Sequence, residues 1–330
     1  MTAPELDDLR RPRTDLVIER TLGPDRWDAA RGPFRSYQRR LDVATGPDGR
    51  FAVTETTDFS LAVPVWRPLI TPLMRRALGS TARTPRRRWW WPRTVVSRRT
   101  SELVAVLVTI SVMTGYLGAL VGQSITFAAR QFGSTDQYQA TTLAAIRVGV
   151  FLSVVLLRQA DRVGRRPVII GFTTAAIVFT AVGAGAPNLW ALGLSQAIAR
   201  GLTTGLITLL LLAVTEEAPA EARAFTISLL TITAALGAGM VVWVLPVADL
   251  GGVVGEIGGW RFLYLVPLLF LPVLARLAPF LAETQRFVAA DEVDAPAPVS
   301  RRWFALLAVA AFASAVFASP ASQLRNEFLS

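Results

Sequence analysis

Residues 161–166 read Asp-Arg-Val-Gly-Arg-Arg, and they lie in a polar gap, Arg158–Arg166, between two long apolar stretches. A helix needs about 20 apolar residues to cross a bilayer, so a gap this short predicts a tight hairpin at one membrane face. Gly164 permits the turn, and the arginines favour the compartment that membrane proteins leave positively charged. We expect the Asp161 carboxylate to accept hydrogen bonds from a neighbouring helix end or from an arginine. The hexapeptide therefore predicts spanning helices joined by a tight hairpin.

The composition of the chain supports this membrane assignment and excludes several chemistries. Apolar residues make up 52% of the 330 residues and the mean hydropathy is +0.43, which is too apolar for an ordinary soluble protein. The net charge of +10 would also suit nucleic acid, but 20 arginines precede Leu103 and most of the others gather in short gaps, as membrane topology predicts. The chain has no Cys, His or Lys, which excludes thiolate and histidine-based catalysis, common zinc sites and lysine-dependent ATP binding. We therefore expect no enzyme activity, no cofactor, no metal and no nucleic-acid partner.

Seven apolar stretches of near-spanning length follow the first hundred residues, and they are rich in small residues that let helices pack closely in lipid. They are Leu103–Ala129, Ala140–Leu157, Pro167–Ala186, Leu189–Val214, Phe225–Val247, Trp260–Ala282 and Trp303–Ser319. The arginine-rich gaps fall on one side of the predicted membrane, so the positive-inside rule places the N-terminus in the cytoplasm. The sequence thus predicts a multi-pass protein of the plasma (inner) membrane, with the lipid bilayer as a partner.

The first hundred residues are polar and contain no stretch long enough to span a bilayer. Alternating residues at Ser36–Ala44 and Arg50–Phe59 flank a plausible hairpin turn, Thr45–Gly49. Leu16–Arg20 is a candidate third strand, and Val65–Leu78 has the pattern of an amphipathic helix. These segments predict a small α+β cytoplasmic lobe, although a partly disordered basic tail fits the same composition.

Arg86–Arg93 closes this region with interleaved arginines and tryptophans. Such a segment can stack on single-stranded nucleic acid. The first spanning stretch begins about ten residues later, however, where Trp prefers the headgroup layer and Arg pairs with anionic lipid. We therefore interpret the segment as a juxtamembrane anchor.

Three further motifs follow the hexapeptide along the chain: Arg200–Gly205 within the fourth stretch, Glu217–Arg223 after it, and Glu283–Arg286 after the sixth. Together with Asp161–Arg166 they resemble the loop and helix motifs of the major facilitator superfamily of transporters. The last of them resembles a segment of the sugar-porter branch, without its two prolines. The resemblance covers roughly residues 103–330, and the first hundred residues lie outside it.

The resemblance implies an all-α membrane fold in which residues 101–287 form a six-helix half bundle behind the lobe of residues 1–100. A cytoplasmic linker, 288–302, and a seventh helix, 303–330, would begin a second half. Members of the family typically have two six-helix halves with substrate held between them. We therefore expect a truncated chain, or one that associates with another chain to complete the path. The resemblance also implies a set of gating residues in the loops: Asp161, Arg162, Gly164, Arg165, Arg166, Glu217, Arg223, Glu283 and Arg286.

Arg147 and Arg200 lie mid-way along the second and fourth apolar stretches. A charge inside a span is costly unless it faces a cavity or a partner, and no carboxylate in the core of a span is an obvious mate. We expect both arginines to bind an anionic or polyhydroxylated solute. For Arg200, hydrogen bonds to backbone carbonyl groups are an equally good alternative. The first, second and fourth spans also contain no central carboxylate, so this half offers no candidate for proton coupling.

The predicted function is secondary transport of a small solute of this kind by alternating access. A seven-helix receptor is the rival class, but it would place its N-terminus outside the cell, against the arginine pattern. A non-catalytic, membrane-anchored protein that binds partners through the N-terminal lobe is the remaining alternative.

Overall fold

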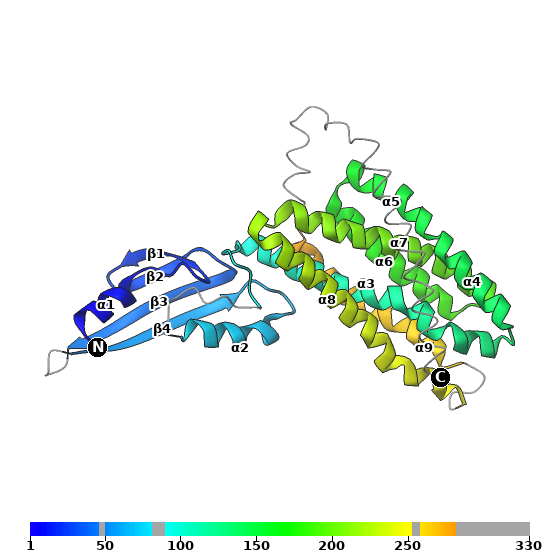
Figure 1. Cartoon of the computed structure of the whole chain (residues 1–330), viewed down its shortest axis with the longest axis horizontal. Helices are drawn as coiled ribbons and strands as arrows, with labels where there is room; N and C mark the ends of the chain where they lie inside the picture. Colours follow the sequence, from blue (N-terminus) through cyan, green and yellow to red (C-terminus); the bar gives the residue numbers. More distant parts are fainter. Residues whose placement is uncertain (46–49, 81–89, 253–257, 282–330) are drawn as a thin grey trace. The chain divides into compact units, whose positions relative to one another are not determined.

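The computed structural model describes residues 1–45, 50–80, 90–252 and 258–281 (Figure 1). For a few helical residues, Asp161 among them, only the backbone is described. The predicted linker and seventh span lie outside the described residues, as do Glu283 and Arg286. All described residues belong to one compact unit, Met1–Val288. The predicted division near Ser101 stays a prediction.

An antiparallel sheet forms the centre of the N-terminal lobe, and its strands follow one another in sequence order. The strands are β1 (Ile18–Gly23), β2 (Arg26–Arg31), β3 (Phe34–Thr45) and β4 (Phe51–Leu61), and the helices of the lobe are α1 (Ala3–Arg10) and α2 (Arg67–Leu78). The structure confirms the predicted small α+β lobe. The strand expected at Leu16–Arg20 is β1, which begins two residues later, at Ile18. The structure also contains β2 and α1, which the sequence pattern did not predict.

One face of the sheet is buried and the other is exposed. Along β3, Tyr37, Arg39 and Leu41 are buried, whereas the even-numbered residues between them are exposed, as strand geometry requires. Met74 of α2 joins the apolar cluster on the buried face, together with Leu16. The lobe therefore has a small core between its sheet and α2.

An ion pair lies at the centre of this buried face. The Arg39 guanidinium donates two hydrogen bonds to the Glu19 carboxylate, at 2.9 and 2.8 Å, and both side chains are fully buried. The Tyr37 hydroxyl donates to the same carboxylate at 2.6 Å, and the Trp27 ring lies 3.8 Å from the guanidinium carbon. Burial, together with the Glu19 charge, raises the pKa of Tyr37 far above its usual value. The hydroxyl therefore stays a donor, and the pair is held in one geometry by its neighbours.

Trp90 and Trp91 are the tryptophans of the predicted anchor that the structure describes. Both are half-buried and pack against the apolar core of the lobe, with their ring centroids 5.7 Å apart in an edge-on arrangement. Within the described residues, the Trp91 indole N–H is buried without a hydrogen-bond partner. The two rings therefore contribute to lobe packing, and membrane anchoring by this segment stays a prediction.

Six apolar helical segments are long enough to cross a membrane, and they confirm the first six predicted spans. Four are continuous or nearly so: α3 (Arg98–Gln131), α6 (Arg165–Ala184), α7 (Leu189–Glu217) and α8 (Ala220–Val244), which the 3₁₀ turn η1 (Leu245–Gly252) extends. The second span consists of α4 (Asp136–Val148) and α5 (Val150–Val163). The sixth consists of α9 (Trp260–Leu265), η2 (Val266–Phe270), α10 (Leu271–Leu277) and η3 (Ala278–Phe280).

Glycines allow α3 and α8 to pack backbone against backbone. A Cβ atom on Gly115 would overlap the Ala234 carbonyl oxygen, and one on Gly237 would overlap that of Val112. Between these helices the Ser111 hydroxyl donates to the Leu230 carbonyl at 2.7 Å. Small residues and interhelical hydrogen bonds are the usual means of association in lipid, where apolar burial adds little between helices.

The second and the sixth span are each interrupted, and the residues at the two interruptions differ in kind. At Gly149 the second span approaches α7 so closely that a Cβ would overlap the Ala197 carbonyl oxygen. In the sixth span Pro267 has no N–H with which to bond the Leu263 carbonyl one turn before it. The Tyr116 hydroxyl of α3 donates to that carbonyl instead, at 2.9 Å. A neighbouring helix thus satisfies the group that the proline leaves open.

Candidate functional site

The hexapeptide forms the hairpin between α5 and α6. Gly164 alone separates the two helices, and its φ of 106° and ψ of 160° lie in a region that side-chain-bearing residues rarely adopt. The tight turn predicted from the sequence is therefore present. It brings the last turn of α5 beside the first turn of α6.

Arg165, the first residue of α6, links three helices at this end of the bundle. Its guanidinium donates to the Ala160 carbonyl of α5 at 3.0 Å and to the Glu216 carboxylate of α7 at 3.2 Å. The side chains of Arg165 and Glu216 are only 13% and 7% exposed, so water screens this ion pair less than a surface pair. The contact therefore joins the ends of α5, α6 and α7.

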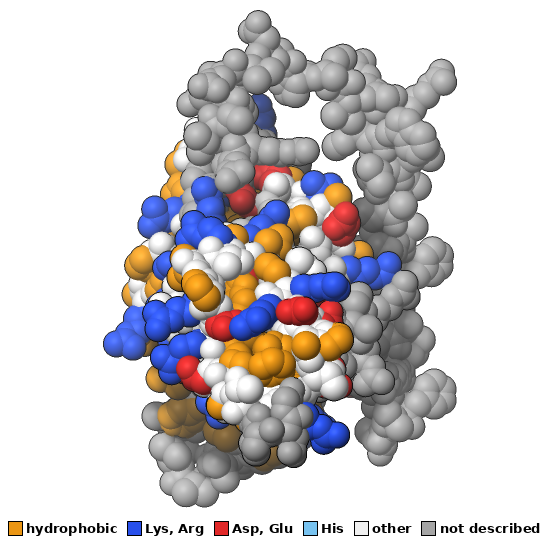
Figure 2. All heavy atoms as spheres, turned by 90° about the vertical axis from the view of Figure 1, so that its left-hand side faces the viewer, with side chains coloured by type: hydrophobic (Ala, Val, Ile, Leu, Met, Phe, Trp, Pro, Cys, Tyr) orange, Lys and Arg blue, Asp and Glu red, His pale blue; other side chains and the backbone are white. Residues whose placement is uncertain are grey.

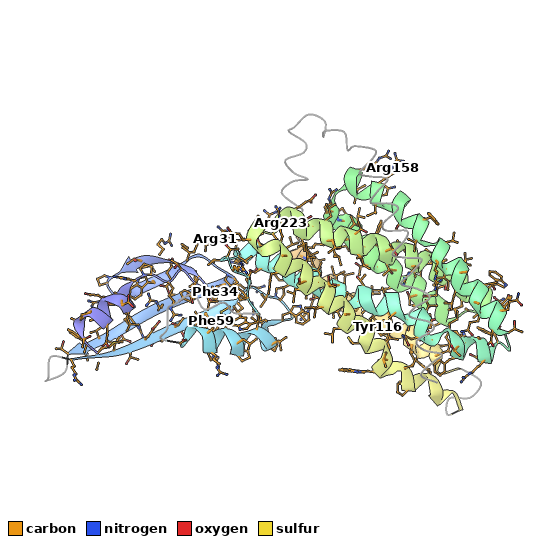
Figure 3. The ribbon with its side chains drawn as sticks, in the orientation of Figure 1. Arg31, Phe34, Phe59, Tyr116, Arg158 and Arg223 are labelled. Atoms are coloured by element: carbon orange, nitrogen blue, oxygen red, sulfur yellow. The ribbon has the colours of Figure 1, made fainter. Side chains whose placement is uncertain are left out.

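Two further arginines of the predicted gating set contact helix ends nearby. Arg223 of α8 donates to the Ala218 carbonyl beyond the end of α7 at 3.1 Å, and Arg166 donates to the Ala278 carbonyl of η3 at 3.4 Å. Figure 3 shows Arg223 and Arg158, an exposed residue of α5, at the same end of the bundle. The structure thus gathers four of the nine residues of the predicted gating set around a single set of helix ends.

The other residues of the predicted gating set are exposed, half-buried or outside the described atoms. Arg162 is exposed, and the Asp161 side chain lies outside the described atoms, as do Glu283 and Arg286. Glu217 ends α7 and is half-buried. A carboxylate that pairs with Arg165 belongs to Glu216, which the sequence reasoning missed. Helical periodicity does not distinguish Glu216 from Glu217, because each lies about one turn after a buried residue of α7.

Arg200 lies in the middle of α7 and is partly buried against α3. Its guanidinium donates to the Gly118 carbonyl at 2.7 Å. A backbone hydrogen bond of this kind is the alternative to solute binding that the sequence leaves open for Arg200. A guanidinium has five N–H donors, so this bond leaves further donors for another acceptor.

Arg147 lies in the last turn of α4, just before the break at Gly149, and is exposed in the structure. Its helix packs against α7, which carries Arg200. Within the described residues neither arginine forms an ion pair with a carboxylate. Two like charges on facing helices therefore lie at mid-span without a carboxylate between them, and their role in solute binding stays a prediction.

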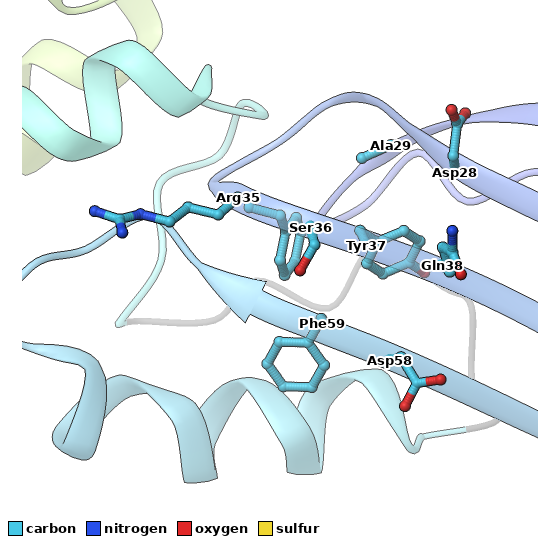
Figure 4. Close-up of a pocket in the computed structure, with 9 residues that line it drawn as sticks. Asp28, Ala29, Arg35, Ser36, Tyr37, Gln38, Asp58 and Phe59 are labelled. Carbon is cyan, nitrogen blue, oxygen red and sulfur yellow. The ribbon is translucent and has the colours of Figure 1, made fainter.

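The lobe has a separate hollow of about 650 Å³ along β2, β3 and β4. Figure 4 shows Asp28, Gln38 and Asp58 beside it, with Tyr37 and Phe59. Asp28 pairs with Arg20 at 2.6 Å, and no group of three acidic residues that could hold a metal occurs among the described residues. Figure 2, which views the lobe side of the molecule, shows acidic and basic side chains interspersed over this surface.

Comparison with known proteins decides the family. Residues 103–303, more than half of the chain, match the family described as sugar (and other) transporter. The chain belongs to the sugar (and other) transporter family. It is accordingly a multi-pass membrane protein, with the spans described above. No curated protein matches the chain.

A solved member of the major facilitator superfamily has a similar fold. It is the proton:xylose symporter XylE bound to 6-bromo-6-deoxy-D-glucose, with a TM-score of 0.50 and 15% sequence identity. The match covers 58% of this chain and 47% of the symporter chain. This sugar-transporter-family chain therefore spans about half the length of the solved structure that it resembles, and the likeness concerns the fold alone.

Proposed function

We propose that this chain provides one half of a secondary transporter that moves a sugar or another small polyhydroxylated or anionic solute by alternating access. Family membership supports transport, and the observation that points to the solute is the cationic pair Arg147 and Arg200 at mid-span. Charged residues inside a membrane are rare and usually face the interior of the bundle or a water-filled cavity, which makes them candidates for a solute pathway. A second bundle, on the same or another chain, would face this one to enclose the path.

The same proposal gives the protein an orientation and a gate. The arginine-rich helix ends around Arg165 face the cytoplasm of the plasma membrane by the positive-inside rule, as does the N-terminus. Contacts that join helix ends in one conformation bias a two-state equilibrium without touching the solute. The Arg165–Glu216 pair, together with Asp161, is our candidate for this contact.

The first test concerns the solute. We expect Arg147→Ala to abolish uptake by proteoliposomes that contain this chain together with the second bundle, while leaving thermal stability unchanged, because the Arg147 side chain is exposed. Arg200→Ala should abolish uptake and also lower stability, since it removes the bond to Gly118. Radiolabelled sugars and sugar phosphates are the probes, and Arg130→Ala, at an exposed position near the end of α3, is the matched control. Normal uptake by the Arg147→Ala protein would remove this residue from the solute path.

The second test concerns the gate. Glu216→Gln should leave membrane insertion intact and slow transport several-fold, because the neutral amide holds Arg165 less firmly than the carboxylate does. Glu221→Gln, at an exposed carboxylate in the first turn of α8, is the control and should behave as the unaltered protein. Equal transport rates for the two variants would reduce the pair to a structural contact.

A further inference from the structure

Helix α2 has one wide apolar face, and the lobe covers only one side of it. Met74, Ala77 and Leu78 are buried. Leu69 and Leu73, one turn apart, point elsewhere and are 60% and 37% exposed. An amphipathic helix of a soluble domain buries its apolar face, so the exposed side of this face indicates a further apolar contact.

The residue before α2 connects this helix to a spanning helix. The Trp66 indole N–H donates to the Thr109 hydroxyl of α3 at 2.9 Å, and the Trp66 ring packs against the apolar core of the spanning helices. At 1.5 Å per residue, Thr109 lies about 9 Å along α3 from Leu103, where the apolar stretch begins. The start of α2 is therefore beside a part of α3 that lies within the first membrane-spanning segment.

The charged residues of α2 are also of the kind found at a membrane interface. The helix contains no acidic residue, and its last turn carries Arg75 and Arg76, both exposed. A helix with apolar residues on one side and arginines at its edge is suited to lie in the plane of a membrane interface. Anionic headgroups attract such arginines.

We infer that α2 is an in-plane membrane helix, with Leu69 and Leu73 among the acyl chains of the leaflet that α3 enters and Arg75 and Arg76 at anionic lipid phosphates. This contact goes beyond the transport function and does not depend on it. The lobe is then bound to the bilayer by its own helix, in addition to its covalent connection to α3.

The natural absence of cysteine allows a direct test in the full chain. Single variants Leu69→Cys and Leu73→Cys carry a nitroxide label, in vesicles of phosphatidylglycerol and phosphatidylcholine. Arg40→Cys, on the exposed face of β3, is the aqueous control, and Leu269→Cys, 75% exposed in the sixth span, is the membrane reference. We expect the labels at 69 and 73 to collide often with oxygen and rarely with a water-soluble nickel chelate, as at 269 and opposite to 40.

Two results would overturn the inference. Collision rates at 69 like those at 40 would place α2 in water, and low collision rates with both reagents would mean that another protein surface covers it. A second variant tests the charges in the Leu69→Cys background: with Arg75→Gln and Arg76→Gln, the label should become more accessible to the chelate. If the accessibility of the label to the chelate did not change in that variant, the two arginines would take no part in the membrane contact.

Discussion

Replacing Gly237 by leucine is expected to separate α8 from α3 and to destabilise the bundle by about 3 kcal/mol or more. The obstacle is the Val112 carbonyl oxygen, which a Cβ at residue 237 would overlap. Backbone atoms cannot rotate away as a side chain can, so the two helices would have to move apart along their contact. The measurement is the thermal unfolding temperature of the protein in detergent, together with its yield from membranes.

Gly239→Leu is the matched control for this experiment. It lies on the same helix, two residues further along, and a Cβ there would meet no atom within 4 Å. We expect the control to insert and unfold like the unaltered protein. If both variants lost the same stability, leucine itself would be the cause, and the close contact of α3 with α8 would carry no special weight.

Replacing Arg39 by methionine is expected to destabilise the lobe by about 3–5 kcal/mol, because it leaves the buried Glu19 carboxylate without its cation. The loss should be local. Hydrogen exchange in the strands of the sheet should accelerate strongly, while exchange in the spanning helices should change little.

The double variant Arg39→Met, Glu19→Gln distinguishes charge from packing. In the structure the Arg13 backbone N–H and the Tyr37 hydroxyl bond different oxygens of Glu19. The single amide oxygen of glutamine can accept from the Arg13 N–H, while its NH2 group donates to the Tyr37 hydroxyl, which can also act as an acceptor. We expect the double variant to recover most of the protection that the single variant loses, because no unpaired charge remains buried. A double variant as unprotected as Arg39→Met would show that the volume and shape of the arginine matter more than its charge.

The spans and the lobe differ in how well the sequence predicts them. An apolar stretch must form a helix in lipid, because backbone groups find no other partner there, and the first six stretches accordingly predict the observed spans closely. The interruption at Gly149 depends on the approach of Ala197, a contact between distant segments that local pattern does not encode. In the lobe, β2 carries Arg-Trp-Asp-Ala-Ala-Arg, without the alternation that marks β3, and pairing with its neighbours is what makes it a strand.

The candidate site also has features that the sequence predicts and features that it does not. The turn at Gly164 follows from the gap between two spans, and it is where the sequence places it. The partner of Arg165 does not follow from the sequence, because Glu216 and Glu217 are adjacent and only the rotation of α7 decides which one meets the guanidinium. For Arg200 the sequence left open whether a solute or a carbonyl group is its partner, and the bond to Gly118 shows that at least one donor is used within the bundle.

The hydrogen bond from Tyr116 to the Leu263 carbonyl bears on the order in which the membrane protein assembles. Until α3 is beside it, the sixth span would leave at Pro267 an open carbonyl in hydrocarbon, where water cannot take the place of the tyrosine. We therefore expect the sixth span to be a less stable helix before it docks on α3 than after docking. On this view α3 inserts into the membrane first. The sixth span, which contains the proline, then packs against α3 in a later step of folding.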